Sequence, residues 1–191
     1  MPTPSNLTAT PPDARSAASG LRHVLIVGGT LRQWAEQPES MWEERIVTFG
    51  ETARGAGARW LTLRPYEAGD GLAEISRREA PVGHGPTTCT VIIDPTVDGR
   101  HRFADAMGGL DPLAVVDEAT VAAALYAPAE AEPDLVLVLG PDSRLPASLV
   151  WELGYAELVF AATPWPELAA ADLARAIDEY TSRSRRFGGL P

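Results

Sequence analysis

Lysine is absent from this 191-residue chain, and cysteine occurs only once, as Cys89. A lone thiol excludes an internal disulfide and is typical of a reducing cytosol. The three histidines are scattered and give no zinc-like spacing with it. Acidic residues outnumber arginines, for a net charge of −10. Because such a surface repels phosphate backbones, we expect no nucleic-acid partner.

Long hydrophobic runs are also missing, and none approaches the ~20 residues that span a bilayer. Residues 1–20 are rich in Pro, Ser, Thr and Ala, without the apolar core of a signal peptide. We therefore expect a disordered tail over residues 1–20 and a single domain over residues 21–191. The expected location is cytoplasmic, with any membrane contact peripheral and made through a partner or a product.

The chain does contain short apolar runs that alternate with segments of helical periodicity. Continuous apolar runs predict buried strands over residues 23–27, 59–63, 89–93, 135–139 and 158–160. Helical spacing predicts helices over residues 42–53, 102–107, 114–126, 149–155 and 170–184, with a weak helix at 72–78. Strands that alternate with helices predict an α/β fold with a mostly parallel central sheet flanked by helices.

One long segment carries a recognisable pattern: PDLVLVLGPDSR at residues 133–144, followed by LVWELGYAELVF at residues 149–160. It resembles the signature of cis-prenyltransferases, the undecaprenyl diphosphate synthases, which reads roughly P-D-L-L-I-R-T-G-G-E-x-R-x-S-N-F-L-L-W-Q-x-x-Y-A-E-L-x-F. Besides the apolar residues of both segments, the residues that match are Arg144, Trp151, Tyr155 and Glu157. The first phosphate-binding arginine of the family is replaced by Val138, and its Ser-Asn pair by Pro146 and Ala147.

The segment HVLIVGGTLRQWA, residues 23–35, is similar to the family's H-V-A-I-I-M-D-G-N-x-R-W-A. The resemblance implies that the catalytic aspartate, which in the family holds Mg²⁺ against the allylic diphosphate, falls on Gly29. A hard divalent cation needs oxygen ligands, so glycine cannot replace this metal anchor. The segment between Leu63 and Cys89 is also shorter than in active homologues, where long helices line the tunnel for the growing chain.

The C-terminal residues 180–189 resemble the family's E-Y-x-x-R-x-R-R-F-G-G. This likeness implies that Arg186 and Gly188 form an R-x-G motif, which in the family reaches across the dimer and helps to bind diphosphate in the partner's site. Arginine suits this role because its planar guanidinium group donates hydrogen bonds to two phosphate oxygens at once. The alternative is a basic helix end favoured by the helix dipole.

The resemblance implies further candidate residues, each with an ordinary structural alternative. Arg144 would bind a phosphate or form a structural salt bridge. The backbone at Gly28 and Gly29 would cradle a phosphate or form only a tight turn. Glu157 would lie near the metal or act as an interface or capping carboxylate. The implied dimer interface, which could equally be core, consists of Trp151, Tyr155, Glu157 and Phe160.

Taken together, the sequence keeps the family's scaffold but has Gly29 in place of the metal-binding aspartate and Val138 in place of the first phosphate-binding arginine. In this it resembles the accessory subunits of heteromeric cis-prenyltransferases, the class that includes the Nogo-B receptor. The resemblance implies a chain inactive on its own, paired in a heterodimer with a catalytically intact homologue. That partner would hold Mg²⁺, and the complex would condense isopentenyl diphosphate with an allylic diphosphate. Two alternatives stay open: a stand-alone synthase of short branched or cyclic prenyl diphosphates, and a homodimeric binding or scaffold protein.

Overall fold

The computed structural model of the chain describes residues 20–70, 74–113, 115–140 and 144–187, the last four of them by their backbone only. Within these residues a six-stranded sheet has the order β3-β4-β2-β1-β5-β6. Neighbouring strands run parallel, except that β3 is antiparallel to β4. The strands are β1 (His23–Val27), β2 (Trp60–Arg64), β3 (Arg78–Val82), β4 (Cys89–Ile93), β5 (Leu135–Leu139) and β6 (Glu157–Ala161).

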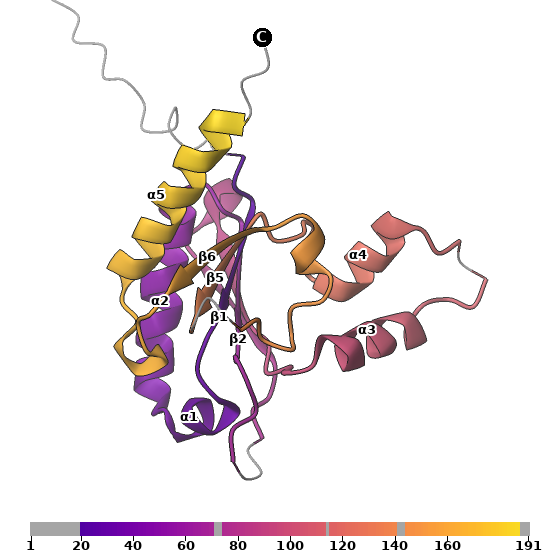
Figure 1. Cartoon of the computed structure of the whole chain (residues 1–191), viewed down its shortest axis with the longest axis horizontal. Helices are drawn as coiled ribbons and strands as arrows, with labels where there is room; N and C mark the ends of the chain where they lie inside the picture. The colour runs from indigo at the N-terminus through magenta and orange to yellow at the C-terminus, as the bar shows by residue number, and fades with distance from the viewer. Residues whose placement is uncertain (1–19, 71–73, 114, 141–143, 188–191) are drawn as a thin grey trace, which may run out of the picture.

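Helices cover both faces of this sheet (Figure 1). On one face α2 (Glu39–Gly55) and α5 (Ala170–Phe187) lie side by side, and on the other α3 (Gly99–Gly108) packs with α4 (Glu118–Tyr126). The short α1 (Leu31–Glu36) follows β1 directly. Three 3₁₀ turns complete the described elements: η3 (Gly85–Thr87), η4 (Glu152–Gly154) and η5 (Trp165–Glu167).

The central strands divide the core into two layers because their side chains alternate in direction. Val24 and Ile26 of β1 face the layer shared with α2 and α5, whereas Leu25 and Val27 face the opposite side. All five residues of β1, and all five of β5, are buried, as expected for parallel strands covered on both faces. Cys89, at the start of β4, is fully buried in the first layer.

The mostly parallel α/β architecture expected from the sequence is confirmed, with strands within one residue of the expected bounds. Two expected helices are wrong. Of the expected weak helix at residues 72–78, the described residues 74–77 form neither helix nor strand, and Arg78 begins the edge strand β3, where pairing with β4 fixes the backbone. The expected helix at residues 149–155 is only the turn η4, because Glu152 is drawn inward by two arginines.

Helix α1 was not expected, although the structure explains it locally. Thr30 is its N-cap: the Thr30 hydroxyl accepts a hydrogen bond from the Gln33 backbone, and the Gln33 side chain accepts one from the Thr30 backbone. This reciprocal capping box supports a helix of only six residues. Across the described parts of the chain, no helix has both the length and the apolar character needed to cross a bilayer.

Candidate functional site

The carboxyl ends of β1, β2 and β5 meet at one edge of the sheet, where open α/β sheets usually bind ligands. A depression of about 310 Å³ lies at this edge. Loops after β1 and β2 are tied together there, since the Tyr66 backbone donates to the Gly29 carbonyl at 2.8 Å. The lining residues are Gly29, Thr30, Gln33, Tyr66, Glu67, Leu139, Gly140, Arg144, Pro164 and Trp165.

Trp165 fills the space beside Gly29. A Cβ atom on Gly29 would lie 2.6 Å from Cγ of Trp165, well inside contact distance, and Gly29 has a φ of +72°, in the left-handed region. Trp165 is 3% exposed and stacks on Trp34 with a centroid distance of 5.1 Å. Trp34 is fixed in turn by a 2.9 Å hydrogen bond from its indole N–H to the Gly28 carbonyl. Any side chain at position 29 must therefore displace a buried, stacked ring.

The residues at this edge do not fit a magnesium site. The position that the resemblance assigns to the metal-binding aspartate is Gly29, and Trp165 occupies the volume that a carboxylate there would need. The acidic side chain at the depression, Glu67, is engaged with Arg144. Within the described residues, no three His, Cys, Asp or Glu side chains gather closely enough to hold a metal ion.

The turn at Gly28 and Gly29 has few free backbone donors for a phosphate. The N–H of Gly28 donates to the Arg64 carbonyl at 3.0 Å, which continues the β1–β2 ladder. The N–H of Thr30, two residues further on, donates to the Gln33 side chain in the capping box. Of the three successive N–H groups at this turn, those of Gly28 and Thr30 are thus satisfied, which favours the structural alternative of a tight strand-to-helix turn.

Arg144 does lie at this edge, beside Gly29. Its guanidinium is 3.4 Å from the Glu67 carboxylate, and both side chains are largely exposed, at 68% and 47%. Its backbone carbonyl accepts a 2.7 Å hydrogen bond from the Tyr66 hydroxyl. Arg144 thus has a salt bridge and yet remains accessible to a ligand from solvent. Val138, where the family has its other arginine, is fully buried in the core.

A buried charge network that the sequence did not reveal lies on the α3 side of the sheet. Glu152 accepts hydrogen bonds from Arg64 at 3.0 Å and from Arg102 at 2.6 Å, and Arg64 also pairs with Asp94 at 3.1 Å. All four residues are less than 9% exposed. In the sequence, this network is indicated only by the polar residues at the ends of two apolar runs, Arg64 and Asp94.

The two carboxylates of this network stay ionised. Burial acts to raise the pKa of Glu152, but the charges of Arg64 and Arg102 outweigh it and hold that pKa below its usual range. Burial likewise acts to raise the pKa of Asp94, and Arg64 together with hydrogen bonds from Thr96 brings it below the usual value. The α3 side of the sheet therefore carries a compensated set of buried ions.

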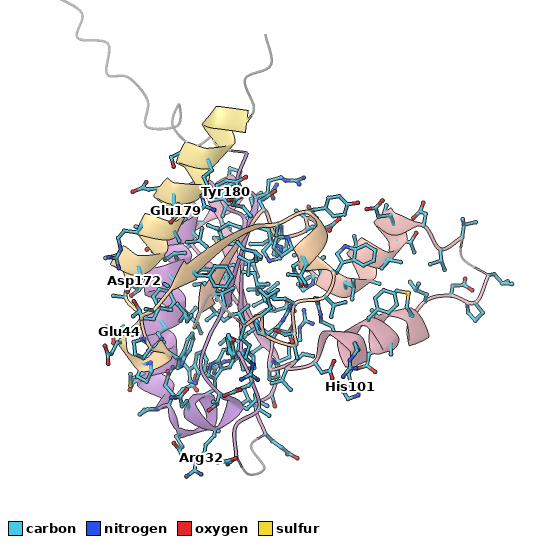
Figure 2. All side chains as sticks on the ribbon, viewed as in Figure 1. Arg32, Glu44, His101, Asp172, Glu179 and Tyr180 are labelled. Carbon is cyan, nitrogen blue, oxygen red and sulfur yellow. The ribbon has the colours of Figure 1, made fainter. Side chains whose placement is uncertain are left out.

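Of the remaining expected residues, Tyr155 and Glu157 lie at the opposite edge of the sheet, whereas Phe160 pairs with Val138 near the carboxyl end of β6. Glu157 begins β6 and pairs with Arg183 of α5, beside a depression of about 320 Å³. Tyr180 of α5, labelled in Figure 2, also lines this depression. Tyr155 is 75% exposed, and Phe160 is half-buried. Trp151 is turned inward, where it stacks on Phe103 and donates to Glu132 at 2.9 Å.

The structure thus brings together Gly29 and Arg144 but separates both from Glu157. β6 runs parallel to β5, so Glu157 sits at the amino end of the sheet, whereas Gly29 and Arg144 lie at its carboxyl end. One strand of five residues spans roughly 16 Å, too far for a shared ligand within one chain. The Arg186 side chain and Gly188 lie outside the described residues.

Comparison with known proteins identifies relatives for much of the chain. Residues 90–188 match the family model described as putative undecaprenyl diphosphate synthase. An isoprenyl transferase 2 of Streptomyces avermitilis is 45% identical over 189 residues, which cover 89% of this chain and 65% of that protein. An isoprenyl transferase 2 of Bradyrhizobium diazoefficiens is 44% identical over 85 residues, covering 44% of this chain and 33% of that protein.

A third relative carries a more specific description. The Lactiplantibacillus plantarum protein described as ditrans,polycis-undecaprenyl-diphosphate synthase, (2E,6E)-farnesyl-diphosphate specific, is 41% identical over 78 residues, covering 39% of this chain and 30% of that protein. The chain therefore spans between 30% and 65% of the length of these three relatives. Since the matched family model covers more than half of the sequence, this chain belongs to the undecaprenyl diphosphate synthase family of prenyltransferases.

Proposed function

We propose that this chain is a non-catalytic accessory subunit of a heterodimeric cis-prenyltransferase. The observation that carries the proposal is Trp165 beside Gly29: the position of the family's metal-binding aspartate is a glycine, and a buried ring closes the space around it. Without a carboxylate to hold Mg²⁺, the developing charge on a diphosphate leaving group has no cation to stabilise it. The same observation disfavours a stand-alone synthase of short prenyl diphosphates.

In this proposal the partner is a catalytically intact homologue that holds Mg²⁺ and binds the isopentenyl and allylic diphosphates. The accessory chain stabilises it by mass action and donates Arg186 and Gly188 to the shared site. Two further features support the idea. Val138, in place of a phosphate-binding arginine, is core, and a set of buried ion pairs lies under α3. The partner-facing surface would include Tyr155, Glu157 and Phe160.

The test is co-expression of this chain with an intact cis-prenyltransferase from the same genome. Each chain alone and the co-purified pair are assayed for incorporation of labelled isopentenyl diphosphate. We expect the pair to co-purify and to exceed the activity of either chain alone. If the homologue is fully active by itself and does not co-purify with this chain, the accessory role is wrong.

Within an active pair, Arg186→Ala should reduce turnover without dissociating the dimer, because it removes only the guanidinium group that would contact the diphosphate. The neighbouring Arg185→Ala is the matched control and should leave turnover unchanged. Dimer mass is followed by light scattering for both variants. Equal turnover in the two variants would show that the R-x-G motif has no part in the reaction.

A further inference from the structure

The indole N–H of Trp165 is a buried donor without an acceptor. Trp165 is 3% exposed, and its Nε1 has no hydrogen-bond partner within the described residues. The two tryptophans that contact its ring are both satisfied. The Trp34 indole donates to the Gly28 carbonyl at 2.9 Å, and the Trp42 indole donates to the Trp34 carbonyl at 3.3 Å. Because a buried tryptophan normally places this N–H on an acceptor, the exception at Trp165 calls for an explanation.

The Trp165 ring is held in place with this donor on one side. It stacks on Trp34 with a centroid distance of 5.1 Å, and the Arg45 guanidinium lies 4.4 Å from the ring centre. The atoms nearest to the place of a side chain on Gly29 are Cβ, Cγ and Cδ1 of Trp165, and Nε1 is bonded directly to Cδ1. Both residues line the depression of about 310 Å³ at the carboxyl edge of the sheet. The unmet donor therefore lies on the side of the ring that borders Gly29 and this depression.

Arg144 brings a positive charge to the same depression. Its guanidinium is 68% exposed, and its ion pair within the described residues is the 3.4 Å contact with the Glu67 carboxylate. An ion pair between two exposed side chains contributes little to stability, so Arg144 can contact a ligand without a large loss. Arg144 and Glu67 are the charged residues of the lining, and their charges cancel.

This balance of charge favours an anion that carries one negative charge. A carboxylate has two oxygens, so it can accept from the Arg144 guanidinium and from the Trp165 indole at the same time. A phosphate monoester is mostly doubly charged at neutral pH, since its second pKa is about 6, and a diphosphate carries more charge still. Glu67 would repel both of these more strongly than it repels a carboxylate.

The other walls set the size and character of the acid. Tyr66, Leu139 and Pro164 offer apolar surface to a ligand. The volume of about 310 Å³ is close to the lower limit of small-ligand sites, about 300 Å³. The depression therefore suits a small acid with a compact apolar body.

We propose that the depression beside Gly29 binds the carboxylate of such a small organic acid, with the Trp165 indole N–H and the Arg144 guanidinium as its donors. The proposal goes beyond the accessory role, because it concerns a ligand of this chain alone and requires no partner subunit, Mg²⁺ or diphosphate. Its failure would leave the accessory role untouched, since that role is tested by the activity of an assembled pair.

The test uses benzoate as the probe, with the full chain and with EDTA in the buffer. Titration is followed by calorimetry and by the indole N–H resonances of the five tryptophans, where the signal lost in Trp165→Phe identifies Trp165. We expect saturable binding of benzoate, a shift of the Trp165 signal, and no binding of benzyl alcohol, which has a similar body without the charge. Failure of benzoate to bind, or equal binding of pyrophosphate, would overturn the proposal.

Two variants remove the donors one at a time. Trp165→Phe keeps an aromatic ring and should raise the Kd of benzoate about fivefold, the loss expected for one hydrogen bond. Arg144→Gln should raise it about tenfold, because the charge is lost as well. Arg32→Gln is the matched control and should leave the Kd unchanged. Arg32 of α1, labelled in Figure 2, is similarly exposed and also paired with one glutamate, but it lies outside the lining of the depression.

Glu67→Gln gives a prediction of the opposite sign. It should lower the Kd of benzoate, because it removes the competing negative charge and releases Arg144 from its ion pair. If Trp165→Phe does not fold, the Arg144 and Glu67 variants still decide, since both side chains are largely exposed. Unchanged affinity in Arg144→Gln, or weaker binding in Glu67→Gln, would contradict the site.

Discussion

At the scale of single residues, Gly29 is the position on which the proposed accessory role rests most directly. We expect Gly29→Asp to destabilise the protein and to restore no activity, because the new Cβ meets Trp165 and the backbone φ is +72°. Crowding and backbone strain together should cost about 2 kcal/mol or more of unfolding free energy, measured by urea denaturation.

Gly55→Ala is the control for this substitution. Gly55 ends α2, and a Cβ there would meet nothing within 4 Å. Replacing glycine in a helix should leave stability unchanged or raise it by up to about 1 kcal/mol. If Gly29→Asp is as stable as the parent and binds Mg²⁺, Trp165 does not close the site as we infer.

His23 makes the stability of the fold depend on pH. Its Nδ1 donates to the Ala131 carbonyl at 2.7 Å, so Nε2 is the acceptor for the Thr62 hydroxyl at 2.9 Å. Burial lowers the pKa of His23 to about 4, with Arg64 adding to the effect and the Ala131 carbonyl opposing it. The folded protein therefore keeps a neutral imidazole where the unfolded chain takes up a proton.

Because the unfolded state binds the extra proton, unfolding free energy should fall as the pH is lowered from about 6.5 to about 4, by roughly 3 kcal/mol from this group. Urea titrations at several pH values measure the slope. His23→Gln should flatten the slope, whereas His84→Gln, at an exposed position, should not change it. An equal slope in the His23 variant would assign the pH dependence to other groups.

At the scale of elements, the ion network joins parts of the chain that are far apart in sequence. Arg64 ends β2, Arg102 belongs to α3, and both contact Glu152 of η4. Glu152→Gln should cost about 3 kcal/mol or more of unfolding free energy, because it leaves two buried arginines with one carboxylate. Chemical denaturation measures the loss.

The comparison for Glu152→Gln is Glu36→Gln, which breaks the exposed i,i+4 pair with Arg32. A solvated pair of this kind contributes about 0.5 kcal/mol or less. Losses of similar size in the two variants would mean that the buried network contributes no more than a surface ion pair.

The same elements show what the sequence could and could not predict. Apolar runs placed β1, β4 and β5, since burial on both faces leaves a strong pattern. The edge strand β3 contains Arg78, Glu79 and Pro81, a composition typical of loops, and only its pairing with β4 makes it a strand. The expected helix at residues 149–155 fails for a tertiary reason, because Glu152 reaches inward to arginines that local periodicity does not reveal.

The candidate site was predicted in part. The resemblance named Gly29 and Arg144 as separate candidates, and the structure places both at the edge formed after β1 and β5. It could not predict Trp165 as the group that closes the space, because Trp165 lies more than a hundred residues from Gly29 in sequence.

At the scale of the whole molecule, the proposed accessory role predicts that this chain alone is indifferent to Mg²⁺. Adding MgCl₂ or EDTA to this chain alone should leave Tm unchanged, because a ligand raises Tm only by binding the folded state. The control is NaCl at matched ionic strength, since screening of a net charge of −10 also affects stability. A rise in Tm specific to Mg²⁺ would reveal a metal site in this chain and weaken the accessory proposal.

The buried position of Cys89 has a practical consequence for spectroscopy. Burial raises the pKa of this thiol to about 12, with Arg54 opposing the shift, so it is neither accessible nor ionised under ordinary labelling conditions. A cysteine introduced on the exposed side of α3, such as Ala104→Cys, would then be the sole reactive thiol. A fluorophore attached there could report distances to a labelled partner without any change to the native core.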